Sequence, residues 1–198
     1  MTDPPPTPAL RDRILDVALQ RFATKGFAAT SVREIVELVG CTKPALYYHF
    51  RSKEALFLEL VRSRIDGLHR VLKAATAGHH TAEQTLLRVA QAILDGVRQS
   101  PLSMRLLITA EHHPDDGQPE VDLRSMHEAF LLYMVTLITN GQERGELRAD
   151  LPAEALAWSF IGAVHVRALG IALGHPVPAD AHRLVVDIFA RGAFAPES

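Results

Sequence analysis

Hydrophobic residues recur at helical spacing along almost the whole chain. Near the N-terminus Leu10, Ile14, Ala18 and Phe22 follow one another at intervals of four residues, and Gly26 ends the run. The same spacing predicts further helices at about residues 53–75, 81–99, 101–112, 119–141, 152–173 and 179–193. No stretch alternates between apolar and polar residues as a half-buried strand would. The pattern therefore predicts an all-α fold.

Between the first helix and residue 53 the pattern predicts two much shorter helices. Ser31 and Glu34 have the spacing of a capping box at the start of one helix, and Gly40 ends it. Thr42 caps the next helix, and Pro44 is tolerated in its first turn, where the backbone amides have no partner within the helix. Two short helices joined by a tight turn, after a longer scaffold helix, form a helix-turn-helix. We therefore predict this motif over residues 31–50.

The second short helix carries two different faces. Leu46 and Phe50, four residues apart, form an apolar face that docks on the scaffold. Tyr47 and Tyr48 point about 100° apart, so at least one of them faces outward. The outward face carries hydrogen-bond donors for phosphates and bases, as in a recognition helix that enters the major groove of DNA.

Composition and charge limit the classes of protein to which this chain can belong. The chain has 198 residues and a net charge of −2, but residues 1–64 hold ten Lys and Arg against seven Asp and Glu. A basic N-terminal part followed by an acidic remainder indicates that only the N-terminal part binds a polyanion. A single cysteine excludes a disulfide framework, and the longest stretch without a charged residue, residues 129–142, is shorter than the about 20 residues of a bilayer span. We expect a cytoplasmic protein.

The sequence offers no catalytic or metal-binding pattern. It contains no Gly-x-Ser-x-Gly, no phosphate-binding glycine loop and no His-Glu-x-x-His motif. The ten histidines do not pair at a spacing of four residues on any predicted helix. We therefore expect a protein that is not an enzyme and that needs no metal and no cofactor.

Residues 8–68 resemble the DNA-binding domain of the tetracycline-repressor (TetR) family. The resemblance lies in residues 14–27, with Phe22 four residues before Gly26-Phe27, in residues 30–36, in residues 42–50 with the run Leu-Tyr-Tyr-His-Phe, and in residues 52–56. It implies contacts with bases or phosphates from Arg33, Thr42, Lys43, Pro44, Tyr47, Tyr48 and His49, and a phosphate anchor at Lys53. Cys41 and Pro44 depart from the residues usual in the family. An ion pair with Glu37 is the alternative role for Arg33.

The resemblance also implies the organisation of the rest of the chain. We expect a disordered arm at residues 1–7, the DNA-binding domain at residues 8–68 and a helical body for ligand binding and dimerisation at residues 69–198. The helix at residues 155–173 is apolar on nearly all faces, so one side requires a partner chain, and the alternative is a core helix buried within a monomer. In the family the last two helices pair with those of a second subunit. The expected homodimer interface consists of Phe160, Val164, Leu184, Val185, Ile188 and Phe189.

The middle helices supply candidates for an apolar ligand pocket. These are Leu94, Leu107, Ile108, Phe130, Tyr133, Met134, Leu137, Trp158 and His165. Each also fits an ordinary core position, and His165 fits a polar handle, a core histidine or an interface residue. The expected protein is a repressor that a small apolar or amphipathic effector releases from a palindromic operator through the long helix at residues 53–75. The alternatives are a helical small-molecule carrier and a sequence-independent architectural DNA-binding protein.

Overall fold

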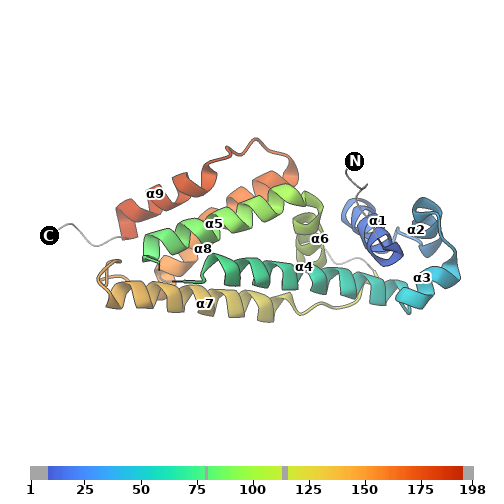
Figure 1. The fold of residues 1–198 in the computed structure, drawn as a ribbon, viewed down its shortest axis with the longest axis horizontal. Helices are drawn as coiled ribbons and strands as arrows, with labels where there is room; N and C mark the ends of the chain where they lie inside the picture. The colour runs from blue at the N-terminus through green and yellow to red at the C-terminus, as the bar shows by residue number, and fades with distance from the viewer. Residues whose placement is uncertain (1–8, 79, 113–115, 194–198) are drawn as a thin grey trace, which may run out of the picture. The chain divides into compact units, whose positions relative to one another are not determined.

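The computed structural model describes residues 9–78, 80–112 and 116–193, and these residues form helices and connecting loops only (Figure 1). The predicted all-α fold is confirmed. The helices are α1 (Leu10–Lys25), α2 (Val32–Val39), α3 (Lys43–His49), α4 (Lys53–Ala75), α5 (Ala82–Gln99), α6 (Pro101–His112), α7 (Leu123–Glu143), α8 (Ala153–Leu173) and α9 (Ala181–Ala193). The expected arm at residues 1–7 lies outside the described residues.

Local hydrogen bonds set the ends of the short helices. Ser31 Oγ accepts from the Glu34 amide at 3.1 Å, Thr42 Oγ1 from the Ala45 amide at 3.3 Å, and Ser52 Oγ from the Ala55 amide at 3.1 Å. Each bond satisfies an amide that has no partner within its helix. Gly40 ends α2 in the left-handed conformation, with φ of 71°. The predicted caps therefore place α2, α3 and α4 one directly after another.

Helix α7 differs from its predicted range at both ends. It starts at Leu123 and not near residue 119, because the Asp122 carboxylate accepts from the Ser125 amide at 3.0 Å and caps the helix there. At the other end the helix continues through Gly141 and ends only before Arg144. Gly141 is buried, and a Cβ there would lie 2.9 Å from Leu147 Cδ1. This glycine permits a close approach and does not stop the helix.

The chain divides into two compact units, which we describe separately. Unit 1 contains residues up to Arg64 together with Arg105–Val121, and unit 2 contains Ile65–Met104 and Asp122–Ser198. The core of unit 1 is built around three phenylalanines. Phe22, Phe27 and Phe57 are all buried, with ring centroids 5.2–5.6 Å apart. In Figure 1, α3 leads directly into the first turn of α4, and α1 and α2 lie at the same end of that helix.

Unit 2 is a bundle in which α8 packs on α5, α7 and α9. Its core contains fully buried side chains from three of these helices, namely Leu86, Leu94, Met134, Ile138 and Phe160. Arg88 of α5 donates from Nε to the Ala75 carbonyl at 2.8 Å and from Nη2 to the Ala74 carbonyl at 3.4 Å. These carbonyls belong to the last turn of α4, so Arg88 ties the end of α4 to α5.

Helix α8 is also long and apolar enough to cross a membrane, judged by length and composition alone. Its mean hydropathy over 18 residues is 1.6, and a third of that window is buried within the chain. The sequence argument considered only stretches without a charged residue, and α8 did not qualify because Arg167 interrupts its apolar run. Burial of Leu156, Phe160 and Val164 in unit 2 accounts for part of this apolar composition.

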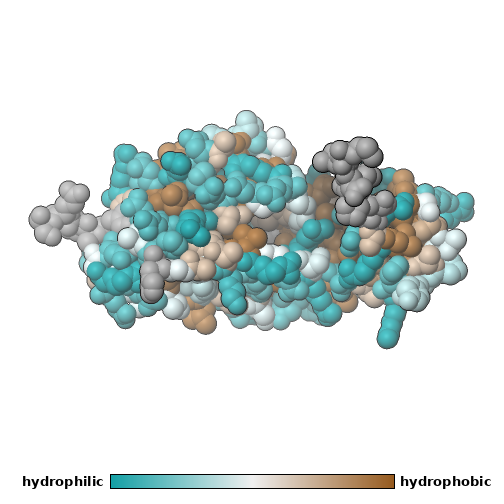
Figure 2. Space-filling view, in the orientation of Figure 1, coloured by the Kyte–Doolittle hydropathy of each residue, from teal (hydrophilic) through white to brown (hydrophobic). Residues whose placement is uncertain are grey.

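On the face shown in Figure 2, hydrophilic residues prevail over α5 and α9.

Candidate functional site

Helix α3 separates a docking face from an exposed face, as the sequence predicts. Leu46 is fully buried and Phe50, directly after the helix, is 4% exposed, so both anchor α3 in unit 1. Tyr48 is 86% exposed and Tyr47 is 45% exposed. Leu46 and Phe50 hold α3 in place from below, so the hydroxyl groups of Tyr47 and Tyr48 can contact a partner while α3 stays packed in unit 1.

The N-terminal end of α3 is exposed as well. Thr42, Lys43, Pro44 and His49 all lie at the surface. Thr42 Oγ1 is used as the cap acceptor, but its hydroxyl hydrogen remains available. Lys43 has no ion-pair partner among the residues that the structure describes. Together with the tyrosines, these exposed side chains of α3 and its N-cap make up a surface that we call the reading face (Thr42, Lys43, Pro44, Tyr47, Tyr48 and His49).

Arg33 on α2 makes the ion pair that the sequence offered as its alternative role. Its Nε lies 2.7 Å from Glu37 Oε1, and both side chains are exposed. The hydrogen bond to Glu37 raises the pKa of Arg33. An exposed pair of this kind contributes little to stability and is screened by salt. The guanidinium can therefore exchange Glu37 for a phosphate.

Lys53 is placed differently from the other candidates. Its Nζ donates to the Phe27 carbonyl at 2.9 Å and to the Thr30 carbonyl at 3.1 Å, and lies 4.1 Å from the centroid of the Phe27 ring. These contacts join the start of α4 to the connection between α1 and α2. The ammonium group therefore supports the frame of unit 1 beneath α3, in addition to the phosphate contact that the resemblance implies.

The comparisons with known proteins agree with this geometry. A family model for bacterial regulatory proteins of the tetR family matches residues 14–60. The HTH-type transcriptional repressor AcnR of Corynebacterium efficiens is 31% identical over 149 residues, which cover 74% of this chain and 73% of AcnR. The chain belongs to the TetR family. It is a DNA-binding transcriptional regulator and not an enzyme, as the sequence predicted.

The fold of this TetR-family regulator recurs in solved structures. The ketosteroid transcriptional regulator KstR2 of Mycobacterium tuberculosis matches with a TM-score of 0.76 at 20% identity, over 96% of this chain and 98% of that chain. A regulator from Saccharomonospora viridis, solved in complex with choline, matches with a TM-score of 0.75 at 20% identity, over 91% of this chain and 95% of that chain. At this identity the likeness concerns the fold.

The expected dimer residues of the TetR-family regulator divide into two groups. Phe160, Val164 and Val185 are buried in the core of unit 2, so their own chain already covers them and the expectation that they face a partner is corrected. Leu184 and Ile188 are exposed on α9, and Phe189 is half-buried, with its ring centroid 5.5 Å from that of Phe160. On α8 the sequence could not separate the covered side from the exposed one, because apolar residues occupy nearly all sides of that helix.

A different set of α8 side chains forms its uncovered face. Trp158 is 56% exposed, Val166 is 65% exposed and Leu173 is 58% exposed. Trp158, the pair His165-Val166 and Leu173 follow one another at spacings of seven or eight residues, about two helical turns, so they lie along one side of the helix. We call this surface, together with Leu184 and Ile188 of α9, the apolar face. Sequence reasoning had placed Trp158 and His165 in the ligand pocket, and both are instead exposed here.

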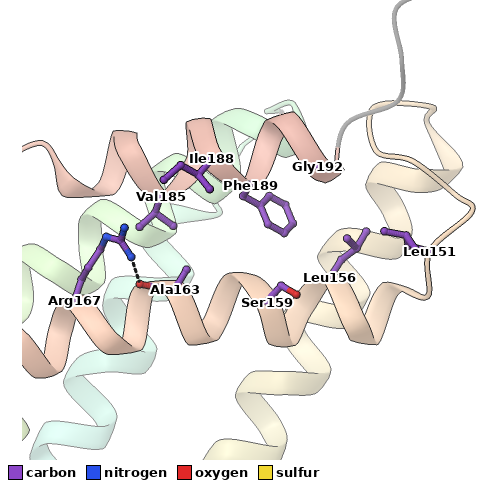
Figure 3. A pocket seen from close by; sticks show the side chains of 9 residues that line it. All are labelled: Leu151, Leu156, Ser159, Ala163, Arg167, Val185, Ile188, Phe189 and Gly192. Atoms are coloured by element: carbon purple, nitrogen blue, oxygen red, sulfur yellow. Dashed lines mark hydrogen bonds between the residues drawn. The ribbon is translucent and has the colours of Figure 1, made fainter.

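A groove of about 370 Å³ runs between α8 and α9 beside the apolar face (Figure 3). Val185 and Phe189 point from α9 toward α8, where Leu156, Ser159 and Ala163 face them. Arg167 closes one end and donates from Nη1 to the Ala163 carbonyl at 2.9 Å. The groove is lined mainly by apolar side chains, with Ile188 at its exposed rim.

The remaining ligand-pocket candidates are not all brought together. Leu94 and Met134 are fully buried in the core of unit 2, and Phe130 and Leu137 pack against that core. Tyr133 and Leu137 line a cleft of about 240 Å³ with polar neighbours, Thr76, His80, Thr85, Thr136, Asn140 and Arg144. Leu107 and Ile108 belong to the part of the chain assigned to unit 1.

The described residues contain no group of three or more His, Cys, Asp and Glu side chains able to hold a metal ion. Cys41, the one cysteine of the chain, is half-buried in the turn between α2 and α3. Its amide donates to the Val36 carbonyl at 3.0 Å, so its backbone closes α2.

Proposed function

We propose that this TetR-family regulator is a repressor that binds a palindromic operator in the cytoplasm and is released by a small-molecule effector. The reading face of α3 carries the proposal. Its anchors are buried, its polar groups are exposed and Lys43 is uncommitted, which is the arrangement a recognition helix requires. The repressor AcnR, which shares 31% identity with this chain, supports repression as the direction of control.

The repressor is proposed to act as a homodimer. The apolar face of α8 and α9 exposes a tryptophan and several large aliphatic side chains, more than an isolated chain leaves uncovered without cost. A second copy that covers the same face on both chains gives a closed two-fold assembly. Two-fold symmetry presents two copies of α3, which fits an operator with palindromic half-sites.

An effector is proposed to bind in unit 2 and to act through α4, the helix that continues from unit 2 into unit 1. The cleft beside Tyr133 and Leu137 mixes hydroxyl, amide and apolar groups, and therefore suits an amphipathic molecule better than a purely apolar one. The choline complex of the Saccharomonospora viridis regulator supports a small-molecule effector for this fold. Linkage requires operator DNA to weaken effector binding by the same factor as the effector weakens operator binding.

A mobility-shift measurement with the duplex upstream of the chain's own gene tests the function. We expect a shift that survives an excess of random duplex, and Lys43→Ala to cost roughly 1–3 kcal/mol if Lys43 contacts a base. Lys73→Ala, which removes an exposed lysine of unit 2, is the matched control and should bind like wild type. No shift with any duplex would instead indicate a small-molecule carrier, and equal shifts with random duplex an architectural protein.

A further inference from the structure

A second basic surface lies in unit 1, beside the reading face. A cleft of about 290 Å³ is bounded by the start of α1, the end of α3 and the first turns of α4. Its charged and polar lining comes from Arg11, His49, Arg51, Glu59 and Arg62, with Phe50, Ala55 and Leu58 between them. We call it the arginine cleft.

The arginines of the arginine cleft differ in whether they form an ion pair within the chain. Arg11 pairs with Glu59, and its guanidinium carbon lies 5.5 Å from the centroid of the Phe50 ring. Arg51 and Arg62 are exposed and have no ion-pair partner among the described residues. Three guanidinium groups therefore face one carboxylate, and two of them are free to meet an anion. Arg pairs well with phosphate because its planar donors match the phosphate oxygens.

The arginine cleft continues the reading face without a gap in sequence. His49, the last residue of α3, belongs to both surfaces, and Arg51 follows it by two residues. Helix α3 has seven residues and is therefore about 10 Å long. The major groove is about 12 Å wide and is walled by phosphates, so a helix that reads bases with its N-terminal residues ends close to one wall. The side chains that follow α3 then meet the phosphate backbone.

We propose that the arginine cleft binds the phosphate backbone of duplex DNA next to the half-site that α3 reads, with Arg51 and Arg62 as the contacting residues. This inference rests on the proposed operator binding and adds contacts that carry no sequence information. Glu59 limits the strength of this contact, because it neutralises Arg11 at the same cleft. The contact raises affinity for every duplex and fixes the position of α3 in the groove.

The test measures the affinity of Arg51→Gln and Arg62→Gln for two duplexes at several salt concentrations, by fluorescence anisotropy. One duplex is selected by the wild-type protein from a random pool, and the other is its scrambled version. Each substitution should lower the affinity for both duplexes by the same factor. The slope of log affinity against log salt should become shallower by about 0.9 for each phosphate lost. Between about 50 and 200 mM salt this changes the affinity ratio by about three- to fourfold.

Two further variants sharpen the result. Glu59→Gln should strengthen binding to both duplexes, because it removes the carboxylate and frees Arg11. Arg70→Gln removes an exposed arginine from the unit 2 part of α4 and should leave both affinities and the slope unchanged. Circular dichroism and melting temperature establish that each variant is folded.

The outcomes separate this inference from the proposed function. Wild-type slopes in both arginine variants, with Lys43→Ala still defective, would overturn the arginine cleft as a DNA contact and leave the repressor intact. A loss confined to the selected duplex would also overturn it, since that would indicate base reading. If the wild-type protein binds no duplex at all, the proposed function itself fails.

Discussion

Lys53 illustrates how a single residue can support the frame of the DNA-binding unit through contacts distant in sequence. Its ammonium bridges two carbonyls, of Phe27 and Thr30, that are distant from it in sequence. Thr30 is buried, and its hydroxyl donates to the Gly26 carbonyl at 2.7 Å, so the whole connection between α1 and α2 is fixed. Resemblance to the TetR family implied a phosphate contact here, and the geometry adds a role for Lys53 in the frame that supports α3.

Lys53→Met keeps most of the aliphatic stem and removes the charge. The free energy of unfolding should fall by about 1–3 kcal/mol, because hydrogen bonds to a charged donor are lost. Operator affinity should fall while the slope of log affinity against log salt stays at the wild-type value. Lys43→Met is the reference variant, and its slope should become shallower by about one if Lys43 contacts a phosphate. A shallower slope for Lys53→Met at unchanged stability would restore the phosphate anchor.

Among the helices, α7 shows how packing overrides a local stop signal. Gly141 resembles a terminator in the sequence, yet it lies inside α7 where Leu147 and Ala82 approach its backbone. The actual stop follows at Gly145, which has a φ of 71°. Helix length in this part of the chain is therefore set by a tertiary contact and by the residue that adopts the left-handed conformation.

Gly141→Ala should lower the free energy of unfolding by about 1–3 kcal/mol. Its Cβ would lie 2.9 Å from Leu147 Cδ1 and 3.0 Å from Ala82 Cβ, which overpacks the site. Gly96→Ala is the control, because nothing lies within 4 Å of a Cβ at this position on α5. It should stabilise the protein by about 0.5–1 kcal/mol, as expected for alanine in a helix interior. Denaturant unfolding followed by circular dichroism measures both, and equal effects would refute the steric argument.

The junction of α4 and α5 depends on Arg88. Arg88→Met retains the aliphatic contact but leaves the Ala74 and Ala75 carbonyls without a charged donor. We expect the free energy of unfolding to fall by about 1–2 kcal/mol. Hydrogen exchange should rise first in the last turn of α4. Exchange that rises uniformly over unit 2, with no earlier loss in this turn, would contradict a local role.

At the scale of the whole molecule, the apolar face of α8 and α9 is the feature that a single chain leaves incomplete. It lies on the helix that also meets the length and composition of a membrane span. In the proposed homodimer, a second copy of the chain covers this face. The predicted interface residues therefore change, from the buried Phe160, Val164 and Val185 to the exposed Trp158, Val166 and Ile188.

Ile188→Glu should convert the proposed dimer to a monomer without unfolding the chain. Ile188 is 57% exposed, so the new carboxylate costs little in the free chain but is buried without a partner in the dimer. Leu132→Glu on α7 is the control, because Leu132 is 67% exposed and lies outside the apolar face. Sedimentation or light scattering gives the mass. A dimer that persists in Ile188→Glu would place the interface elsewhere. Val185→Glu is unsuitable for this test, because a buried carboxylate at Val185 would unfold unit 2.

Much of the fold follows from local chemistry and was therefore predictable. Helix positions follow from hydrophobic spacing, and Ser31, Thr42 and Ser52 cap their helices with bonds to residues three positions away. The two faces of α3 follow from the 100° rotation between neighbouring residues, which separates Leu46 from Tyr47 and Tyr48. Bonds and rotations of this kind involve residues close in sequence, and so the sequence by itself determined the reading face.

Only the tertiary structure decided which neighbours the remaining residues meet. Lys53 reaches carbonyls more than twenty positions away, and the arginine cleft joins residues from three separate helices. On α8, apolar residues occupy every side, so spacing alone could not distinguish the covered side from the exposed one. These outcomes depend on how helices pack against one another. Packing is a property of the assembled chain, because burial is decided by residues that are distant in sequence.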